Sequence, residues 1–223
     1  MATRTYRSPR REQAAAHTRA VILDAAEELF AERGYANTTV NQVAAAAAVA
    51  PNTVYTSVGG KPQLVVALAE RAAAHPVISS GLEAIDTMTD GREIIQLLAE
   101  GTKAARRSQQ RAIAVMLDNV TADPLIAHTA ERITALLRKR IHRIATRLGA
   151  IGALPAGMTT AHAAAILWFY FSFTAWRELR ALGWAWKEIE QWLGGQAISA
   201  LLAAPDSTAR IGHSTSSTRP GTR

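Results

Sequence analysis

The sequence predicts an all-α protein, in which an N-terminal three-helix helix-turn-helix domain precedes a C-terminal helical bundle. Two observations lead to this fold class. No segment alternates apolar and polar residues with the β-branched enrichment that is typical of strands. Alanine is abundant, and Pro and Gly lie between segments whose apolar residues recur at helical spacing. The 223 residues are 48% hydrophobic, which is enough to bury a sizeable core.

The N-terminal part predicts a basic arm and three helices. Residues 1–10 are polar, and we expect them to be disordered. A helix over 11–33 carries one apolar stripe and ends at Gly34. Asn37, Thr38 and Thr39 offer caps for a second helix over 40–47, and a turn leads to a third helix over 51–57. The apolar stripe of the first helix consists of Ile22, Ala25, Ala26, Leu29 and Phe30.

A fourth helix links the two predicted domains. Pro62 opens this helix after a Gly-Gly break, and Pro76 closes it after about residue 74. We place the helix-turn-helix domain at 11–60 and a larger helical domain at 61–204. The fourth helix is then expected to be the only continuous rigid element that joins them.

The remaining chain predicts long helices and a tail. Asp90 and Glu93 resemble a capping box for a helix to about residue 106, and a separate helix follows from 108 to 120. Asp123 caps a helix to about 148, and Thr159 or Thr160 caps an apolar helix to about 182. A last helix covers 186–203. Residues 205–223 are rich in Ser, Thr, Gly, Pro and Arg and predict a flexible tail.

Composition and charge narrow the function classes. The absence of cysteine excludes disulfides, thiolate catalysis and Cys-ligated metal centres. The net charge of +7 and the pI of about 10.4 favour a nucleic acid or another anionic partner. The most apolar run, 163–171, is too short to span a bilayer, and no signal-peptide pattern follows the basic N-terminus. We therefore expect a cytoplasmic protein with no membrane partner.

The segment from 38 to 61 has the pattern of two short helices that cross at a steep angle around a three-residue turn. The side chains left outside are polar but uncharged, which suits hydrogen bonds to base edges and phosphates: Asn52, Thr53, Tyr55 and Thr56. The alternative is an alanine-rich helical hairpin without a role in DNA binding. Small apolar residues form the inner face and fill the turn: Val40, Val43, Ala44, Ala47, Val49, Val54 and Val58.

Residues 11–70 closely resemble the tetracycline-repressor (TetR) family of transcriptional regulators. The resemblance rests on LFAERGYANTTV at 29–40, on the NQVAAAAAVAPNTVYTSV that follows, and on Gly-Gly-Lys at 59–61; the Trp-containing pattern at 176–196 adds support. It implies a homodimer that binds a palindromic operator in double-stranded DNA. By position, the resemblance assigns phosphate contacts to Thr39, Thr53, Tyr55 and Lys61, and the major groove to Pro51, Asn52 and Thr56. Asn41 and Gln42 fall where the second helix can approach bases or backbone.

The chain departs from the family pattern at three positions of this segment. Ala48 stands where Gly is usual in the turn, and a positive φ there would cost alanine about 1 kcal/mol. Val58 replaces a common aromatic residue, and Gly60 replaces the usual polar cap. These departures affect the rigidity of the motif and remove no predicted DNA contact.

Two apolar helices near the C-terminus predict a dimer interface. The helix over 161–182 is apolar nearly all round, and the last helix repeats this pattern, so both need cover on more than one side. Gly194 and Gly195 lower helix stability, which a close helix–helix approach would offset. The alternative is that both helices form only intrachain core. As the family implies, we assign the interface to Trp168, Phe171, Ala175, Leu179, Ile189, Trp192, Leu193 and Ala197.

The resemblance also implies a cavity for a small-molecule effector in the second domain. Such pockets are mostly apolar, and the aromatic content favours an apolar or aromatic ligand. The arginine-rich run from Arg138 to Arg147 could contact nucleic acid or an anionic ligand, or could form a solvated helix end. Candidates for lining the cavity, each of which could instead serve core packing, are Met88, Met116, His128, His162, Trp168 and Tyr170.

No catalytic or cofactor-binding constellation is apparent. His128 and Glu131 lie one helical turn apart, but no second pair supports a metal site. Gly59-Gly60-Lys61 lacks the other residues of a phosphate-binding loop. We therefore expect no enzymatic activity, no cofactor and no metal. The expected function is repression at a promoter, relieved by a ligand. The alternatives are a co-repressed or activating regulator, a ligand-binding helical dimer that does not bind DNA, and a helical enzyme with an unrecognised site.

Overall fold

A computed structural model describes residues 9–74 and 76–202, with side chains for 10–74 and 81–202. All regular structure in these ranges is helical, which confirms the predicted fold class. The basic arm, apart from residues 9 and 10 at the start of the first helix, and the C-terminal tail lie outside the described residues. The helices are α1 (Pro9–Arg33), α2 (Val40–Ala46), α3 (Pro51–Ser57), α4 (Lys61–Ala73), α5 (Pro76–Thr87), α6 (Gly91–Asp118), α7 (Pro124–Ala150), α8 (Thr160–Phe171), α9 (Phe173–Ala181) and α10 (Trp186–Leu201).

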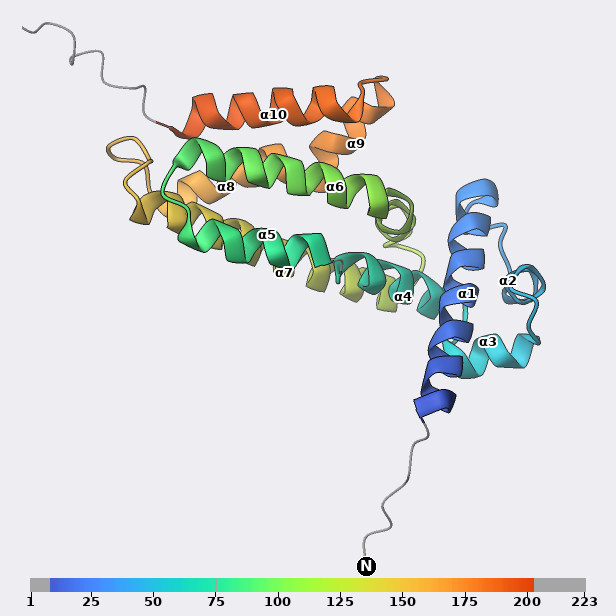
Figure 1. Ribbon diagram of the computed structural model, residues 1–223. Coiled ribbons are helices and arrows are strands. Elements are labelled where there is room, and N and C mark those ends of the chain that lie inside the picture. Colours follow the sequence, from blue (N-terminus) through green and yellow to red (C-terminus); the bar gives the residue numbers. More distant parts are fainter. Residues whose placement is uncertain (1–8, 75, 203–223) are drawn as a thin grey trace, which may run out of the picture.

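The helices form two regions, which Figure 1 shows at opposite ends of α4. We call α1–α3 the head and α5–α10 the body. In the body, α10 packs on α6 and α8, and α7 packs on α8, so that the long helices run side by side. In the head, α1 stands across the end of the body while α2 and α3 pack on its far side (Figure 1). This arrangement leaves α2 and α3 at an outer end of the molecule.

The apolar core crosses from the head into the body. One cluster joins α1–α3 to α4 and to the ends of α6 and α7 that lie nearest the head, and it includes the fully buried Val43, Val54 and Leu64 together with Met116 and Ile126. A second cluster lies among α5–α10. The domain boundary predicted after residue 60 therefore falls between two helices that share one core.

The structure corrects three helix boundaries of the body. Pro76 does not end helical structure but begins α5, because proline is tolerated in the first turn of a helix. The break predicted before Ser108 is absent: α6 is continuous there, and the hydroxyl of Ser108 donates to the carbonyl of Ala105 within it. The single helix predicted over 161–182 is two helices, because Ser172 takes an extended backbone conformation between α8 and α9.

The caps at the starts of α6 and α8 follow the predictions in part. Asp90 accepts hydrogen bonds from the N–H groups of Arg92 and Glu93, while no described bond from the Glu93 side chain completes a capping box. Of the two threonines offered for α8, Thr159 is the cap.

Two elements connect the head to the body. α4 packs against both α6 and α7, as the predicted connecting helix should. However, α1 also packs directly on α6, so α4 is not the only helix through which the head and the body are in contact. None of the described helices combines the length and the hydropathy needed to cross a membrane.

Candidate DNA-binding interface

The start of α2 is fixed by a reciprocal cap. The hydroxyl oxygen of Thr39 accepts from the N–H of Gln42 at 3.3 Å, and the side-chain oxygen of Gln42 accepts from the N–H of Thr39 at 2.8 Å. Thr38, which was predicted as a possible cap, is buried, and its hydroxyl donates to the carbonyls of Leu29 and Gly34. Gln42 is thus held in the cap, while Thr39 and Asn41 are exposed at the surface.

The turn between α2 and α3 depends on Ala48. This residue has φ of 53°, in the left-handed region, and it is the only non-glycine residue with positive φ in the described ranges. The conformation allows the N–H of Val49 to donate to the carbonyl of Ala44 at 3.0 Å, which closes the turn. An L-residue with a Cβ is disfavoured there by about 1–2 kcal/mol. The predicted strain at this departure from the family pattern is therefore present.

α3 presents a polar face on an apolar scaffold. Pro51 occupies the first turn, and Val54 is fully buried against the head core. Asn52 and Thr56 are exposed, and the Tyr55 side chain is 54% exposed. Pro51 is exposed as well, and Thr53 is half-buried. The predicted outward set therefore lies at the surface of one short helix.

The end of α3 is held by a residue that the sequence reasoning missed. Nη1 of Arg19, on α1, donates to the carbonyl oxygen of Ser57 at 2.6 Å. The last carbonyls of a helix lack intrahelical partners and attract cations. Arg19 thus positions α3 relative to α1. No sequence pattern pairs residues 38 positions apart, so this contact became visible only in the fold.

Lys61 joins the start of α4 to the loop that follows α1. Its Nζ donates to the carbonyl of Ala36 at 3.1 Å and lies 4.2 Å from the ring centroid of Tyr35. Partial burial lowers the pKa of Lys61. An ammonium group has three N–H donors, so donation to Ala36 leaves two for another acceptor. Gly59 lies two residues before Lys61 and has φ of 118°. This positive φ requires glycine, and a Cβ there would also lie 2.8 Å from the Gln63 side chain.

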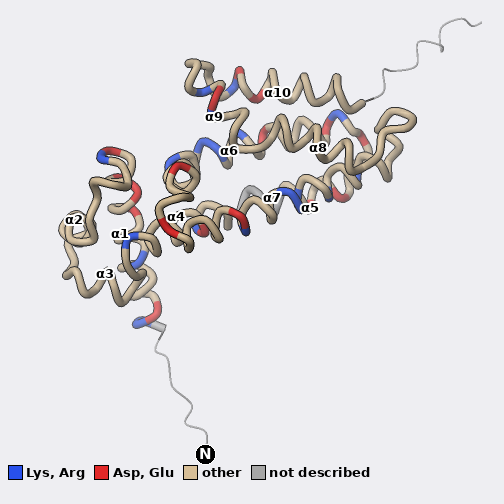
Figure 2. The backbone as a smooth tube through the Cα atoms, turned by 180° about the vertical axis from the view of Figure 1, so that it is seen from behind, with Lys and Arg blue, Asp and Glu red and all other residues tan. Residues whose placement is uncertain are grey.

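The surface formed by α2 and α3 carries no formal charge. No Asp, Glu, Lys or Arg occurs from residue 37 to residue 60. Figure 2 shows both helices without coloured segments, whereas α1 carries both signs. Contacts from this surface must therefore come from neutral hydrogen-bonding groups, with Lys61 as the cation at its edge.

The structure separates the predicted effector-binding residues. Met116 is buried and lines a cavity of the body together with the half-buried Trp168. Met88 and Tyr170 pack against the body core. His128 and His162 are exposed, so their assignment to a buried ligand site is corrected. Within the described part of the chain, no three His, Asp or Glu side chains converge to hold a metal ion.

The predicted interface residues of the body also divide by burial. Trp192 is 45% exposed, and Trp168, Ala175 and Leu179 are half-buried. Four others are buried in the core of the chain itself and cannot face a second copy, which corrects their assignment: Phe171, Ile189, Leu193 and Ala197.

The two glycines of α10 have different surroundings. A Cβ on Gly194 would lie 3.3 Å from the Cβ of Ala99 on α6, which fits the close helix approach expected from the sequence. Gly195 is exposed, and its Cβ would meet no described atom within 4 Å. Phe169, which was not assigned to the interface, is 70% exposed on α8.

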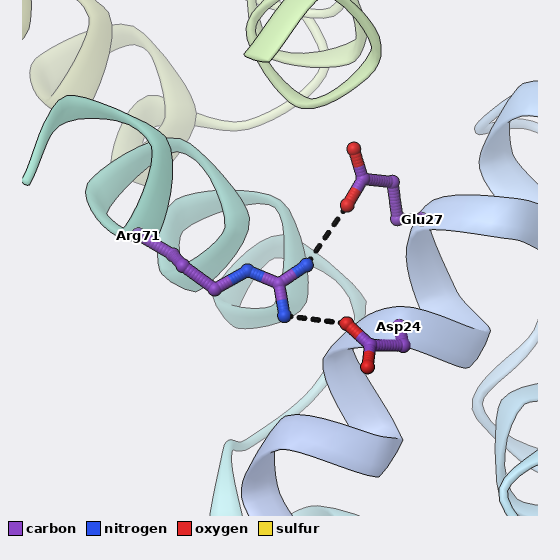
Figure 3. A network of polar contacts seen from close by, with 3 residues as sticks. All are labelled: Asp24, Glu27 and Arg71. Carbon is purple, nitrogen blue, oxygen red and sulfur yellow. Dashed lines mark hydrogen bonds and ion pairs between the residues drawn. The ribbon is translucent and has the colours of Figure 1, made fainter. Parts of the chain in front are cut away.

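An ion-pair network links α4 to the head (Figure 3). Nη1 of Arg71 lies 2.6 Å from Oδ1 of Asp24, and its Nη2 lies 2.8 Å from Oε2 of Glu27. The neighbouring residue Glu70 pairs with Arg132 of α7. The connecting helix is therefore tied by charge to both the head and the body.

Comparisons with known proteins agree with this geometry. Residues 22–68 match the family described as bacterial regulatory proteins, tetR family. No curated protein sequence matches the chain significantly. Among solved structures, a SmeT–triclosan complex is 20% identical with a TM-score of 0.68, over 92% of this chain and 100% of that one. NalD, the secondary repressor of the MexAB-OprM multidrug efflux pump in Pseudomonas aeruginosa, is 23% identical with a TM-score of 0.68, over 85% and 98%.

A third similar structure covers a comparable share of the chain. A putative transcriptional regulator from Saccharomonospora viridis, in complex with choline, is 16% identical with a TM-score of 0.70, over 85% of this chain and 100% of that one. These likenesses extend over both regions, and the family match covers α2, α3 and parts of α1 and α4. Residues 22–68 thus match the tetR family of bacterial regulatory proteins, and the described chain shares the all-helical fold of these solved structures.

Proposed function

We propose that the protein is a ligand-responsive transcriptional repressor that binds a palindromic operator as a homodimer. The observation that carries this proposal is the polar, uncharged face of α3, which is exposed on a rigid apolar scaffold at one end of the molecule. An α-helix fits the major groove of B-DNA, where neutral amide and hydroxyl groups distinguish bases by their donors and acceptors.

The contacts of each head divide into two kinds. Asn52 and Thr56 read base edges, with Pro51 beside them. Tyr55, Thr53 and Thr39 contact phosphates, and so does Lys61 through the donors that Ala36 leaves unused. Asn41 approaches the backbone from the exposed side of α2, whereas Gln42 mainly holds the cap that orients this helix.

The dimer forms through the exposed sides of α8 and α10. These helices pack on each other, and they expose Phe169, Trp192 and the bare backbone at Gly195. Large apolar side chains at a surface favour contact with a protein partner. A symmetric dimer would place its two α3 helices about 34–36 Å apart, one turn of DNA, and would therefore select an inverted repeat.

A ligand in the body weakens DNA binding through α4. One body cavity is lined by Met116, by Trp168 and by Ala73, which is the last residue of α4. A molecule in this cavity would therefore contact the connecting helix directly. The likeness to solved complexes with triclosan and with choline supports a body that holds small molecules, and the likeness to a secondary repressor supports the sign of regulation.

The test is a selection of fragments from the organism's own genome by the full-length protein, followed by fluorescence anisotropy against random DNA. We expect inverted repeats that bind at least about a thousandfold more tightly than random sequence. Equal affinity for both would refute the operator. A protein that binds small molecules but no fragment would be the ligand-binding helical dimer without DNA-binding activity.

A further inference from the structure

A cationic side chain lies inside the body without an ionic partner. Arg106 of α6 is only 8% exposed. Its Nη2 donates to the carbonyl of Phe171 at 3.1 Å, and its guanidinium carbon lies 4.2 Å from the ring centroid of Phe173. Its Nε is buried and has no hydrogen-bond partner among the described residues. Burial lowers the pKa of Arg106 to about 10, so the group keeps its charge at neutral pH.

Two cavities meet at this guanidinium. The first lies among α5, α6, α7 and α8 and has mainly aliphatic walls that include Leu82, Leu98 and Ile141. The second extends toward α9. Arg106 and Arg140 line both cavities.

Both arginines lack a carboxylate partner in the described part of the chain. The arginines that form ion pairs there are others: Arg71, Arg132, Arg143 and Arg177. Arg140 is half-buried, and this burial lowers its pKa. Outside the described residues, the sequence contains one carboxylate side chain, Asp206. A buried guanidinium without an anion is unfavourable, and a bidentate carboxylate is the partner that fits its geometry.

We propose that the body binds a small monocarboxylate with an apolar hydrocarbon portion, whose carboxylate pairs with Arg106 and Arg140. The apolar portion occupies the aliphatic cavity among α5–α8, and the carboxylate end lies at the two arginines that also line the second cavity, beside Ala73 of α4. This inference rests on the proposed function, in which the body binds an effector. It replaces the expected apolar or aromatic ligand with an amphipathic anion.

A purely structural role for Arg106 makes a different prediction. α8 ends at Phe171, because the backbone leaves the helical path at Ser172. The carbonyl of Phe171 then accepts a hydrogen bond from Arg106. If capping α8 were the whole role, removing Arg106 would destabilise the protein without affecting ligands. If the site awaits an anion, an apolar residue of similar length relieves an uncompensated charge and leaves stability equal or higher.

The experiment uses the full-length protein and two matched pairs of probes: decanoate with 1-decanol, and 2-naphthoate with 2-naphthylmethanol. Isothermal titration calorimetry gives affinities, and melting temperatures without probe report stability. We expect at least one carboxylate to bind about tenfold or more tightly than its alcohol. Arg106→Met and Arg140→Met should each abolish this preference, and Arg106→Met should melt no lower than the wild type.

Matched controls sit beside each arginine. Arg107→Met and Lys139→Met change exposed cations on the same helices and should leave the preference unchanged. The proposal is overturned if neither carboxylate binds, if the alcohols bind equally well, or if the preference survives in Arg106→Met. Operator binding without probe is measured separately, so a protein that binds carboxylate but no DNA would refute only the proposed function.

Discussion

The head and the body place their recognition groups in opposite environments. The head exposes uncharged polar side chains on an apolar scaffold, while the body encloses a cation within one. Water solvates Asn52, Tyr55 and Thr56 in the free protein, so these groups do not weaken the fold. The Arg106 guanidinium has lost most of its water and gained one hydrogen bond and one aromatic face, so it destabilises the body until an anion arrives. The exposed polar groups of the head thus carry no desolvation cost in the free protein, whereas the buried guanidinium of the body lowers stability as long as it is unpaired.

The largest expected effect comes from breaking the dimer, which we propose that the body forms and on which the affinity of the heads depends. Trp192→Arg places a charge on the exposed side of α10, where we propose that the partner packs. We expect monomers in analytical ultracentrifugation and a loss of operator affinity of roughly 100-fold or more, because two linked heads gain avidity that one head lacks.

The control for this prediction is Leu125→Arg, an exposed apolar residue of α7 outside the proposed interface. It should leave both the dimer and the operator affinity unchanged. A Trp192→Arg protein that remains dimeric and folded would move the interface away from α10.

A second prediction divides the head surface into base-reading and phosphate-contacting groups. Asn52→Ala should weaken operator binding and lower discrimination at one base pair by about 1–3 kcal/mol. Tyr55→Phe should weaken operator and random DNA equally, because phosphates carry no sequence information. Anisotropy with operator variants measures both. Equal losses on operator and random DNA for Asn52→Ala would remove its base-reading role.

The sequence predicted the head better than the body, and the reason is physical. The head depends on local signals: Thr39 caps a helix that begins one residue later, Pro51 opens α3, and the family pattern marked Ala48 as unusual. The body depends on contacts between distant residues. No Gly or Pro marks the bend at Ser172 in the sequence. This bend leaves the carbonyl of Phe171 available to Arg106, which lies 65 positions earlier in the chain.

The same limit explains the errors in the candidate sites. Helical periodicity showed that α10 has more than one apolar side but could not decide which side packs on α6 and which stays at the surface. Ile189 and Leu193 therefore entered the predicted interface although they lie in the core. The histidines were chosen by residue type alone, and both turned out to lie on the surface.

A third, smaller effect tests how the head turn is built. Ala48→Gly relieves the left-handed conformation of a residue with a Cβ and should raise the free energy of unfolding by about 0.5–1 kcal/mol. Ala45→Gly, at an exposed position inside α2, should lower it by about 1 kcal/mol. Urea denaturation of the two variants measures the difference. A destabilised Ala48→Gly would mean that the turn relaxes in solution to a conformation that alanine prefers.

The smallest expected effect on stability concerns the junction of the two regions. Arg71 on α4 pairs with Asp24 and Glu27 of α1, and these side chains are partly exposed. Exposed pairs of this kind contribute less than about 1 kcal/mol, so Arg71→Gln should melt close to the wild type. Its effect should appear instead in the coupling between ligand and DNA, because the ion pairs make α4 and α1 move together.

The measurement is the operator affinity with and without saturating decanoate. In the wild type, we expect decanoate to weaken operator binding, and operator to weaken decanoate binding by the same factor, as linkage requires. Arg71→Gln should reduce this factor while leaving operator affinity without decanoate nearly unchanged. Arg177→Gln breaks a similarly exposed pair with Asp118, between α9 and α6, and should leave the factor intact. An unchanged factor in Arg71→Gln would mean that the coupling runs through the packing of α1 on α6, the second link between head and body.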